Sequence, residues 1–385
     1  MRFCYPEGLR EFLVMLTINY MIESSVGSSL ILYFIIIPII FLFSFLVAPD
    51  EVYANVKGLC SNCHTMHNSQ NNAPVYADGP TGNLLKNDCV GCHSSDTAET
   101  KVTNGSTVIP IVFNTSNGTP PAIPLAGGNF YWVEFAGDNY GHNVLGVSDA
   151  DLTLTAAPGS TGCANSCHTS LALATAGNGC QGCHNSLKHH GTDPGDGNPE
   201  TADSGWYRFL SAPANHGGMG GAPVAGIEDD DWEYTAGAND HNIYYKGTGS
   251  DFEAPQSVGK FCAGCHAAFH SPGFAGVWED NGGGTDPWLR HPTDYAIPSS
   301  GEYAAVVGTA YDPLVPVGKP VPLAAPEDLS VVKAGDVVMC LSCHRAHGSP
   351  YPHMLRWNSD TIRTGATGAA VGTGCFKCHS AKDGA

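Results

Sequence analysis

One short pattern recurs through the chain and constrains what it can fold into. Cys-x-x-Cys-His occurs six times and Cys-x-x-x-Cys-His once, and these stretches hold 14 of the 15 cysteines. The remaining cysteine, Cys4, lies near the N-terminus. We number the stretches as sites 1 to 7 in chain order. They are Cys60, Cys63 and His64; Cys89, Cys92 and His93; Cys163, Cys167 and His168; Cys180, Cys183 and His184; Cys262, Cys265 and His266; Cys340, Cys343 and His344; and Cys375, Cys378 and His379.

The chemistry of this pattern indicates covalent haem. Two thiols a few positions apart can form thioethers to the two vinyl groups of one haem, and the adjacent histidine reaches the iron as the proximal ligand. Zinc is the main alternative, because Cys-x-x-Cys pairs also bind zinc, but zinc sites do not require a histidine directly after the second cysteine. The sequence therefore predicts seven haem c groups. Site 3 is included because a loop longer by one residue still spans two vinyl groups.

The composition argues against conventional globular domains. Among 385 residues, 47 are glycine and 26 are proline, and charged residues make up 14%, against roughly 25% in typical soluble domains. Aromatic residues make up 9%, which fits poorly with simple disorder. We expect a multihaem cytochrome c fold, mostly irregular coil with short helices and few short strands, wrapped around the haems.

The distribution of charged and aromatic residues excludes one function and predicts the structure of two short segments. The net charge is −19 and no run of Lys and Arg occurs, so nucleic-acid binding is not expected. The acidic residues 228–231 are interpreted as a solvated loop. The aromatic stretch at residues 129–135 is interpreted as a strand or as an aromatic wall beside a haem.

The N-terminal region is interpreted as an export segment. Residues 30–48 form an apolar run, and Val52-Tyr53-Ala54 offers small residues at a cleavage site. The predicted division is therefore 1–54 as a signal peptide, or alternatively as a membrane anchor, and 55–385 as a heptahaem cytochrome c domain. Covalent attachment of haem c takes place outside the cytoplasm, which agrees with export.

Histidines outside the motifs are candidates for the sixth iron ligand. The chain has 17 histidines, of which seven are proximal. His67, His270 and His347 follow a proximal histidine by three or four residues and project to the same side of the local chain, so each is expected to ligate a neighbouring haem. We expect bis-histidine ligation and low reduction potentials. The ten candidates are His67, His142, His189, His190, His216, His241, His270, His291, His347 and His353.

Residues beyond the motifs resemble the OmcS/OmcE-type extracellular multihaem cytochromes. The similar stretches are CSNCHTMHNSQ from residue 60, Gly141-His142-Asn143, WLRHP from residue 288, MCLSCHRAHG from residue 339 and GCFKCH from residue 374. The resemblance implies a continuous chain of stacked haems, and subunits in which a histidine of one ligates a haem of the next, at the position of His67. It implies as distal ligands His67, His142, His241, His270, His291 and His347, plus His190 or His189.

The resemblance and the histidine surplus together predict electron transfer rather than catalysis. We expect a polymeric cytochrome nanowire that exchanges electrons with redox partner cytochromes and delivers them to extracellular acceptors such as metal oxides. The expected location is extracellular or at the cell surface, and the alternative is periplasmic. The alternative functions are a monomeric periplasmic shuttle and a multihaem reductase of nitrogen or sulfur oxyanions, which would need an open iron site.

Overall fold

The structure, a computed structural model, describes most of the haem-motif region. The described residues are 56, 58–115, 120–154, 157, 171–173, 179–184, 187, 189, 208, 210, 224–246, 256–266, 291, 293–303, 305–320, 328–363 and 373–380. All of them belong to the unit Ala54–Ala385. The predicted segment 1–54 lies outside the described residues, and so do Cys163, Cys167 and His168 of site 3. Within the part described, no helix has the length and apolar character needed to cross a bilayer.

The helices are short, and four of the five described α-helices overlap an attachment motif. A single helical turn brings residues i and i+3 to one side, which is the spacing of the two cysteines in each regular motif. The α-helices are α3 (Cys60–Cys63), α4 (Cys89–His93), α5 (Tyr131–Ala136), α6 (Val258–His266) and α7 (Cys340–Cys343). The 3-10 turns are η1 (Gly82–Leu84), η2 (Asp138–Tyr140), η3 (Gly179–Gly182), η5 (Gly301–Tyr303), η6 (Pro352–Met354), η7 (Ser359–Thr361) and η8 (Gly374–Lys377).

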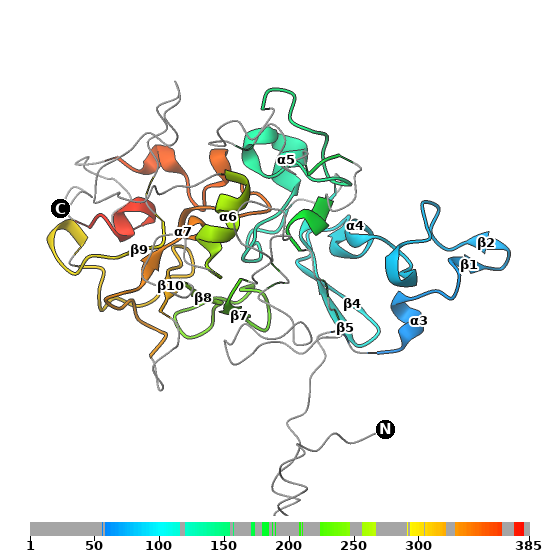
Figure 1. Cartoon of the computed structure of the whole chain (residues 1–385), viewed down its shortest axis with the longest axis horizontal. Coiled ribbons are helices and arrows are strands. Elements are labelled where there is room, and N and C mark those ends of the chain that lie inside the picture. The colour runs from blue at the N-terminus through cyan, green and yellow to red at the C-terminus, as the bar shows by residue number, and fades with distance from the viewer. Residues whose placement is uncertain are drawn as a thin grey trace, which may run out of the picture. The chain divides into compact units, whose positions relative to one another are not determined.

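The strands are equally short and form one small sheet and three pairs. The sheet has five strands in the order β7-β8-β10-β11-β9, with β8 and β10 parallel and the other neighbours antiparallel. Figure 1 shows the longest pair, β4–β5, as a hairpin near α4. The strands are β1 (Ser69–Gln70), β2 (Ala73–Pro74), β3 (Ser94–Ser95), β4 (Lys101–Asn104), β5 (Thr107–Pro110), β6 (Phe113–Asn114), β7 (Gly226–Ile227), β8 (Ile243–Tyr245), β9 (Tyr295–Ala296), β10 (Gly318–Lys319) and β11 (Val337–Val338).

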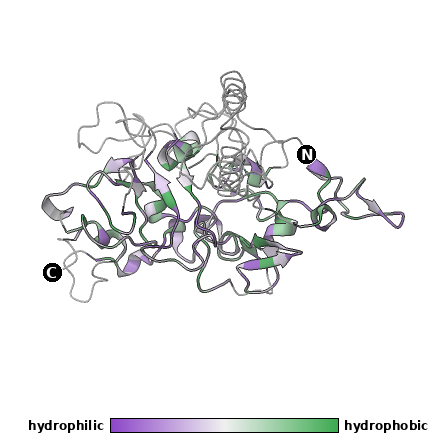
Figure 2. Cartoon of the chain, turned by 90° about the horizontal axis from the view of Figure 1, so that it is seen from below, coloured by the Kyte–Doolittle hydropathy of each residue, from purple (hydrophilic) through white to green (hydrophobic). Residues whose placement is uncertain are grey.

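The buried apolar side chains form small clusters, each of which borders an attachment cysteine. One cluster packs against Cys262 and Cys340, a second against Cys180 and a third against Cys378. Figure 2 likewise shows apolar residues distributed over many short elements. The prediction of mostly irregular chain with short helices and few short strands is confirmed.

Residues 129–135 were interpreted as a strand or as an aromatic wall beside a haem, and the strand interpretation is wrong because the segment contains the start of a helix. α5 begins after Phe130, and the side chain of Asn129 accepts a hydrogen bond from the backbone N–H of Tyr131 at 2.9 Å. Phe130 and Val133 are buried, whereas the rings of Tyr131 and Phe135 contact each other at 4.7 Å between centroids. The spacing of three and four residues, rather than alternation, decides the helical state.

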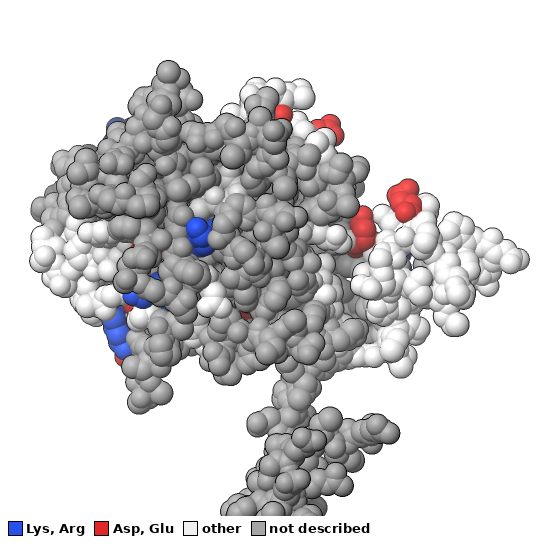
Figure 3. Space-filling view, viewed as in Figure 1, with Lys and Arg blue, Asp and Glu red and all other residues white. Residues whose placement is uncertain are grey.

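The acidic residues 228–231 do not form the expected solvated loop. Glu228 forms an ion pair with Arg208 at 2.8 Å, and both side chains are largely buried. Asp229 is 8% exposed and accepts hydrogen bonds from the backbone N–H groups of Asp231 and Glu233. In Figure 3 most of the visible described Asp and Glu side chains lie at the upper right, and the visible Lys and Arg side chains lie at the left and centre.

Candidate haem-binding sites

Most of the described proximal histidines are oriented by the backbone of a distant segment. In four sites the Nδ1 atom lies 2.7–2.9 Å from a carbonyl oxygen, which only accepts hydrogen bonds, so Nδ1 carries the hydrogen and Nε2 presents its lone pair. A metal-binding histidine is fixed in this way by its second nitrogen. The pairs are His64 with Asn83, His93 with Pro110, His184 with Arg208 and His344 with His353.

Sites 1, 4 and 6 share one local arrangement. In each, the proximal histidine forms an antiparallel bridge with a leucine, and the carbonyl that orients it belongs to the residue two positions before that leucine. That residue has a left-handed backbone, with φ of 55° at Asn83, 47° at Arg208 and 61° at His353. The leucines are Leu85, Leu210 and Leu355.

Sites 1 and 6 match further. The backbone N–H of Lys86 donates to the carbonyl of Cys63, and that of Arg356 donates to the carbonyl of Cys343, both at 2.8 Å. The sequences His-Thr-Met-His-Asn-Ser and His-Arg-Ala-His-Gly-Ser, which begin at His64 and His344, are also similar. His67 therefore occupies in site 1 the place that His347 occupies in site 6.

Four proximal histidines each face a second imidazole from elsewhere in the chain. The ring centroids lie 6.4 Å apart for His93 and His189, 6.2 Å for His184 and His347, 6.0 Å for His266 and His142, and 6.0 Å for His379 and His291. Two imidazoles that bind one metal atom from opposite sides have centroids about 6 Å apart, since each metal–nitrogen bond is about 2 Å and each ring centre lies about 1 Å behind its nitrogen.

These residues fit a haem in donor type. At site 7 a cavity is lined by both His291 and His379, and also by Cys375, Cys378 and Trp357. The two thiols are available for thioethers and the two imidazoles for the iron.

Neighbouring cysteines connect the sites into a row. Cys63 of site 1 interacts electrostatically with Cys92 of site 2, and Cys183 of site 4 interacts in the same way with Cys265 of site 5. Cys343 of site 6 interacts with both cysteines of site 7. Sites 2 and 4 are joined by a hydrogen bond between the thiols of Cys89 and Cys180, which lowers the pKa of Cys89 to about 7. Sites 5 and 6 are joined by a hydrogen bond between the thiols of Cys262 and Cys340, where α6 packs against α7. Among the described residues, the row therefore runs through sites 1, 2, 4, 5, 6 and 7.

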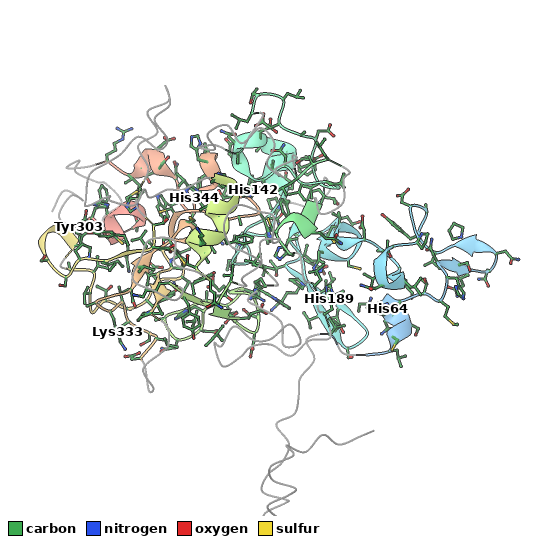
Figure 4. All side chains as sticks on the ribbon, in the orientation of Figure 1. His64, His142, His189, Tyr303, Lys333 and His344 are labelled. Carbon is green, nitrogen blue, oxygen red and sulfur yellow. The ribbon has the colours of Figure 1, made fainter. Side chains whose placement is uncertain are left out.

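Residues 344–348 contact three of these sites. His344 is proximal in site 6, and His347 faces His184 of site 4. The carbonyl of Ala346 accepts a hydrogen bond from Nδ1 of His142, which faces His266 of site 5. Burial and the neighbouring imidazoles lower the pKa of His347 to about 3, so its ring is held neutral as a ligand requires. Figure 4 shows His142 and His344 near each other and both apart from His64.

The other described candidates for distal ligation have different surroundings. His67 is exposed, while the next residue, Asn68, is 6% exposed and is bonded to both backbone groups of Tyr76. His241 is buried and lies flat on Tyr311, with ring centroids 3.6 Å apart, and it faces no proximal histidine in the described chain. His353 is exposed.

The expanded motif of site 3 is not described by the structure. Its two predicted attachment cysteines, Cys163 and Cys167, and its predicted proximal ligand, His168, all lie outside the described residues. The distal candidates His190, His216 and His270 lie outside them as well. The assignment of Cys167 and His168 to a haem therefore stays a prediction from the sequence, as does the ligand role of His270.

Sequence reasoning anticipated one of the aromatic residues beside these candidate ligands and missed the other. Phe130, which stacks on His347 at 4.6 Å between centroids, belongs to the stretch interpreted as a strand or an aromatic wall. Tyr311, which stacks on His241, was not singled out. The repeat of His-x-x-His followed by a small polar or glycine residue and serine was visible in the sequence and predicts the shared arrangement of sites 1 and 6.

Comparison with known proteins agrees with this arrangement. Residues 330–384 match the family described as a doubled CXXCH motif. The C-type cytochrome OmcS of Geobacter sulfurreducens is 25% identical over 374 residues, covering 78% of each chain. Two solved structures, an outer membrane cytochrome S filament and the OmcS nanowires of the same organism, are each 22% identical with a TM-score of 0.50. They cover 79% and 86% of this chain, and this chain covers 84% and 92% of theirs. The chain thus has the fold of a multihaem cytochrome.

Proposed function

We propose that this chain, a multihaem c-type cytochrome of the OmcS type in sequence and fold, conducts electrons along a row of haems and polymerises head to tail outside the cell. A bound haem c supplies one-electron exchange at its iron. The chain's cysteines would hold the haems covalently, its histidines would bind the irons as neutral imidazoles, and its fold would keep successive sites in contact.

One observation supports this proposal most strongly: at each of four sites in the row, the proximal histidine faces a second imidazole. We assign His189, His347, His142 and His291 as the distal ligands of sites 2, 4, 5 and 7. An iron with two histidine ligands has no open position for a substrate, so the arrangement favours electron transfer over reduction of a small molecule. Because His189 is the residue that faces His93, we assign it in preference to His190.

The equivalence of His67 and His347 supports a junction between subunits. His347 of site 6 faces site 4, which lies two places earlier in the row. By the same relation, His67 of site 1 would face the site two places before it, which in a head-to-tail polymer is site 6 of the preceding subunit. Within the described chain, no imidazole faces His344, the proximal histidine of site 6. We therefore assign His67 of one subunit as the distal ligand for the haem held by His344 of its neighbour.

Several finer parts of the proposal come from the sequence. Seven covalent haems are proposed from the motifs, including one held by Cys163, Cys167 and His168. Export, redox partner cytochromes and extracellular acceptors such as metal oxides are proposed from the resemblance. A head-to-tail contact that does not close into a ring generates an open helical filament. Because the junction ligand completes a haem, the row continues from one subunit to the next.

Electron microscopy of the extracellular fraction from cells that express the chain tests the proposal. We expect filaments whose purified protein contains seven haems per chain by intact mass, with a low-spin ferric spectrum. A protein that is exported, carries all its haems and stays monomeric at every concentration would contradict polymerisation and leave a diffusing carrier. A stable high-spin haem in assembled filaments would contradict ligation by two histidines throughout.

A further inference from the structure

Arg356 is a buried cation with no counter-ion among the residues that the structure describes. It is 6% exposed, and its Nε donates to the carbonyl oxygens of Leu341 and His344, while Nη1 donates to that of Pro313. Nη2 is buried and has no hydrogen-bond partner among the described residues. No carboxylate of the described chain lies within ion-pair distance of this guanidinium. A buried charge in this condition is strongly unfavourable unless a partner is supplied.

The other buried basic groups nearby differ from Arg356 in their hydrogen bonding. Lys319 is paired with Asp336 at 2.7 Å, and both side chains are fully buried. Arg345 donates to the carbonyls of Leu125 and Ala126, and burial together with the charge of Arg356 lowers its pKa to about 9. Arg356 is thus the described guanidinium with a buried nitrogen, Nη2, that has no hydrogen-bond partner in the described chain.

The position of Arg356 identifies the chemistry of that partner. Its hydrogen bonds to Leu341 and His344 place the guanidinium against α7, the attachment helix of site 6, whose Cys343 interacts with both cysteines of site 7. The next residue, Trp357, lines the cavity of site 7 and also has a buried donor, Nε1, with no hydrogen-bond partner in the described part of the chain. Every haem carries two propionate carboxylates, and a guanidinium fork matches a carboxylate in both charge and geometry.

We propose that Arg356 binds a propionate of one of the two C-terminal haems through Nη2, and that its charge raises the reduction potential of that haem. An ionised propionate stabilises the ferric iron, and a fixed cation beside the propionate cancels this effect. Charge and hydrogen bonding around a haem are among the means by which a protein sets its potential. The inference rests on haem at sites 6 and 7 but not on polymerisation, so a chain that fails to form filaments still tests it.

A potentiometric titration of the holoprotein at pH 5, 7 and 9 tests the inference. In Arg356→Gln with seven haems by intact mass, we expect one haem to titrate at a lower potential than in the wild type. The difference should grow from pH 5 to pH 9, because at low pH the released propionate takes up a proton and becomes neutral. Arg363→Gln is the matched control, since Arg363 is exposed in the same region, and its titration should equal the wild type.

A titration of Arg356→Gln that equals the wild type at all three pH values, even with lower thermal stability, would overturn the inference and leave Arg356 a structural residue. If Arg356→Gln yields no holoprotein, Arg356→Lys carries the test, because Lys86 in the matching place of site 1 shows that the arrangement accepts lysine. A compact ammonium in place of the fork should shift the propionate carboxylate bands in redox-difference infrared spectra, and unchanged bands would overturn the inference.

Trp357→Phe distinguishes the two haems that could supply the propionate. If the propionate belongs to site 7, Trp357→Phe and Arg356→Gln should change the same component of the titration, and their effects in the double variant should not add. If the propionate belongs to site 6, the two substitutions should change different components of the titration, and their effects should add in the double variant. Absence of seven haems in the wild type would instead refute the proposed cofactor content, an outcome separate from any result on Arg356.

Discussion

Nδ1 of His142 lies 2.6 Å from the carbonyl oxygen of Ala346, although 204 residues separate them in sequence. Because Ala346 stands between His344 and His347, this one hydrogen bond ties the imidazole facing site 5 to a segment that also serves sites 4 and 6. The geometries of three successive sites are therefore linked, and a displacement of residues 344–348 would disturb all of them together.

Replacing His142 should remove the sixth ligand from one haem iron, in monomers and in filaments alike. In His142→Ala we expect seven covalent haems and one more high-spin haem than in the wild type of the same assembly state, as measured by electron paramagnetic resonance. Asn139→Ala, at an exposed residue nearby, should leave the spectrum unchanged. A wholly low-spin spectrum in His142→Ala would mean that another group ligates this iron.

Replacing His67 should instead prevent assembly and leave one haem high-spin. His67→Ala should give an exported monomer with seven haems that forms no filaments, because the ligand at the proposed junction is lost. His353→Asn is the control, since His353 is also exposed and asparagine tolerates its left-handed backbone. Ordered filaments of normal length from His67→Ala, with every haem low-spin, would exclude His67 as the junction ligand.

Gly128 should tolerate no side chain. Its φ is +84°, and a Cβ atom would lie 2.0 Å from the carbonyl oxygen of Gly348, its partner in a parallel bridge. Gly301 also has a positive φ, +68°, but with open space around it. Backbone strain alone should cost Gly301→Ala about 1–2 kcal/mol, and the clash should add about 1–3 kcal/mol for Gly128→Ala. Equal denaturation midpoints for the two variants would contradict this reasoning.

The buried pair of Lys319 and Asp336 should respond asymmetrically to mutation. Lys319→Met leaves a buried carboxylate unpaired and should lower the free energy of unfolding by roughly 3–5 kcal/mol, whereas the double variant with Asp336→Leu should recover most of the loss. Lys377→Met, at the more exposed pair with Asp312 at 3.4 Å, should cost less than about 1 kcal/mol. Denaturant titration measures all three, and no recovery in the double variant would refute the explanation.

The sequence was most informative where covalent chemistry fixes residue spacing. The attachment motifs, the low content of regular structure and the distal candidates His142, His291 and His347 all followed from motif spacing, histidine count and resemblance. The sequence did not predict which of His189 and His190 faces His93. Adjacent histidines project to different sides of the chain, and only the course of the chain determines which of them faces the site.

Non-local partners account for the errors. Residues 228–231 are acidic and were expected in solvent, but Arg208, 20 residues earlier, buries Glu228. The ligand role of His241 stays a prediction, because its ring stacks on Tyr311 and no proximal histidine of the described chain faces it. Short aromatic stretches such as residues 129–135 fit a strand or a helix until the packing of Phe130 and Val133 decides between them.

The oxygens that orient the proximal histidines at Asn83, Arg208 and His353 belong to the main chain. A carbonyl survives nearly any substitution of its own residue, and here an asparagine, an arginine and a histidine serve the same purpose. Mutational drift can therefore replace the side chains around a haem without removing the group that aims its ligand. A lineage built this way can diverge far in sequence while its metal chemistry stays constant.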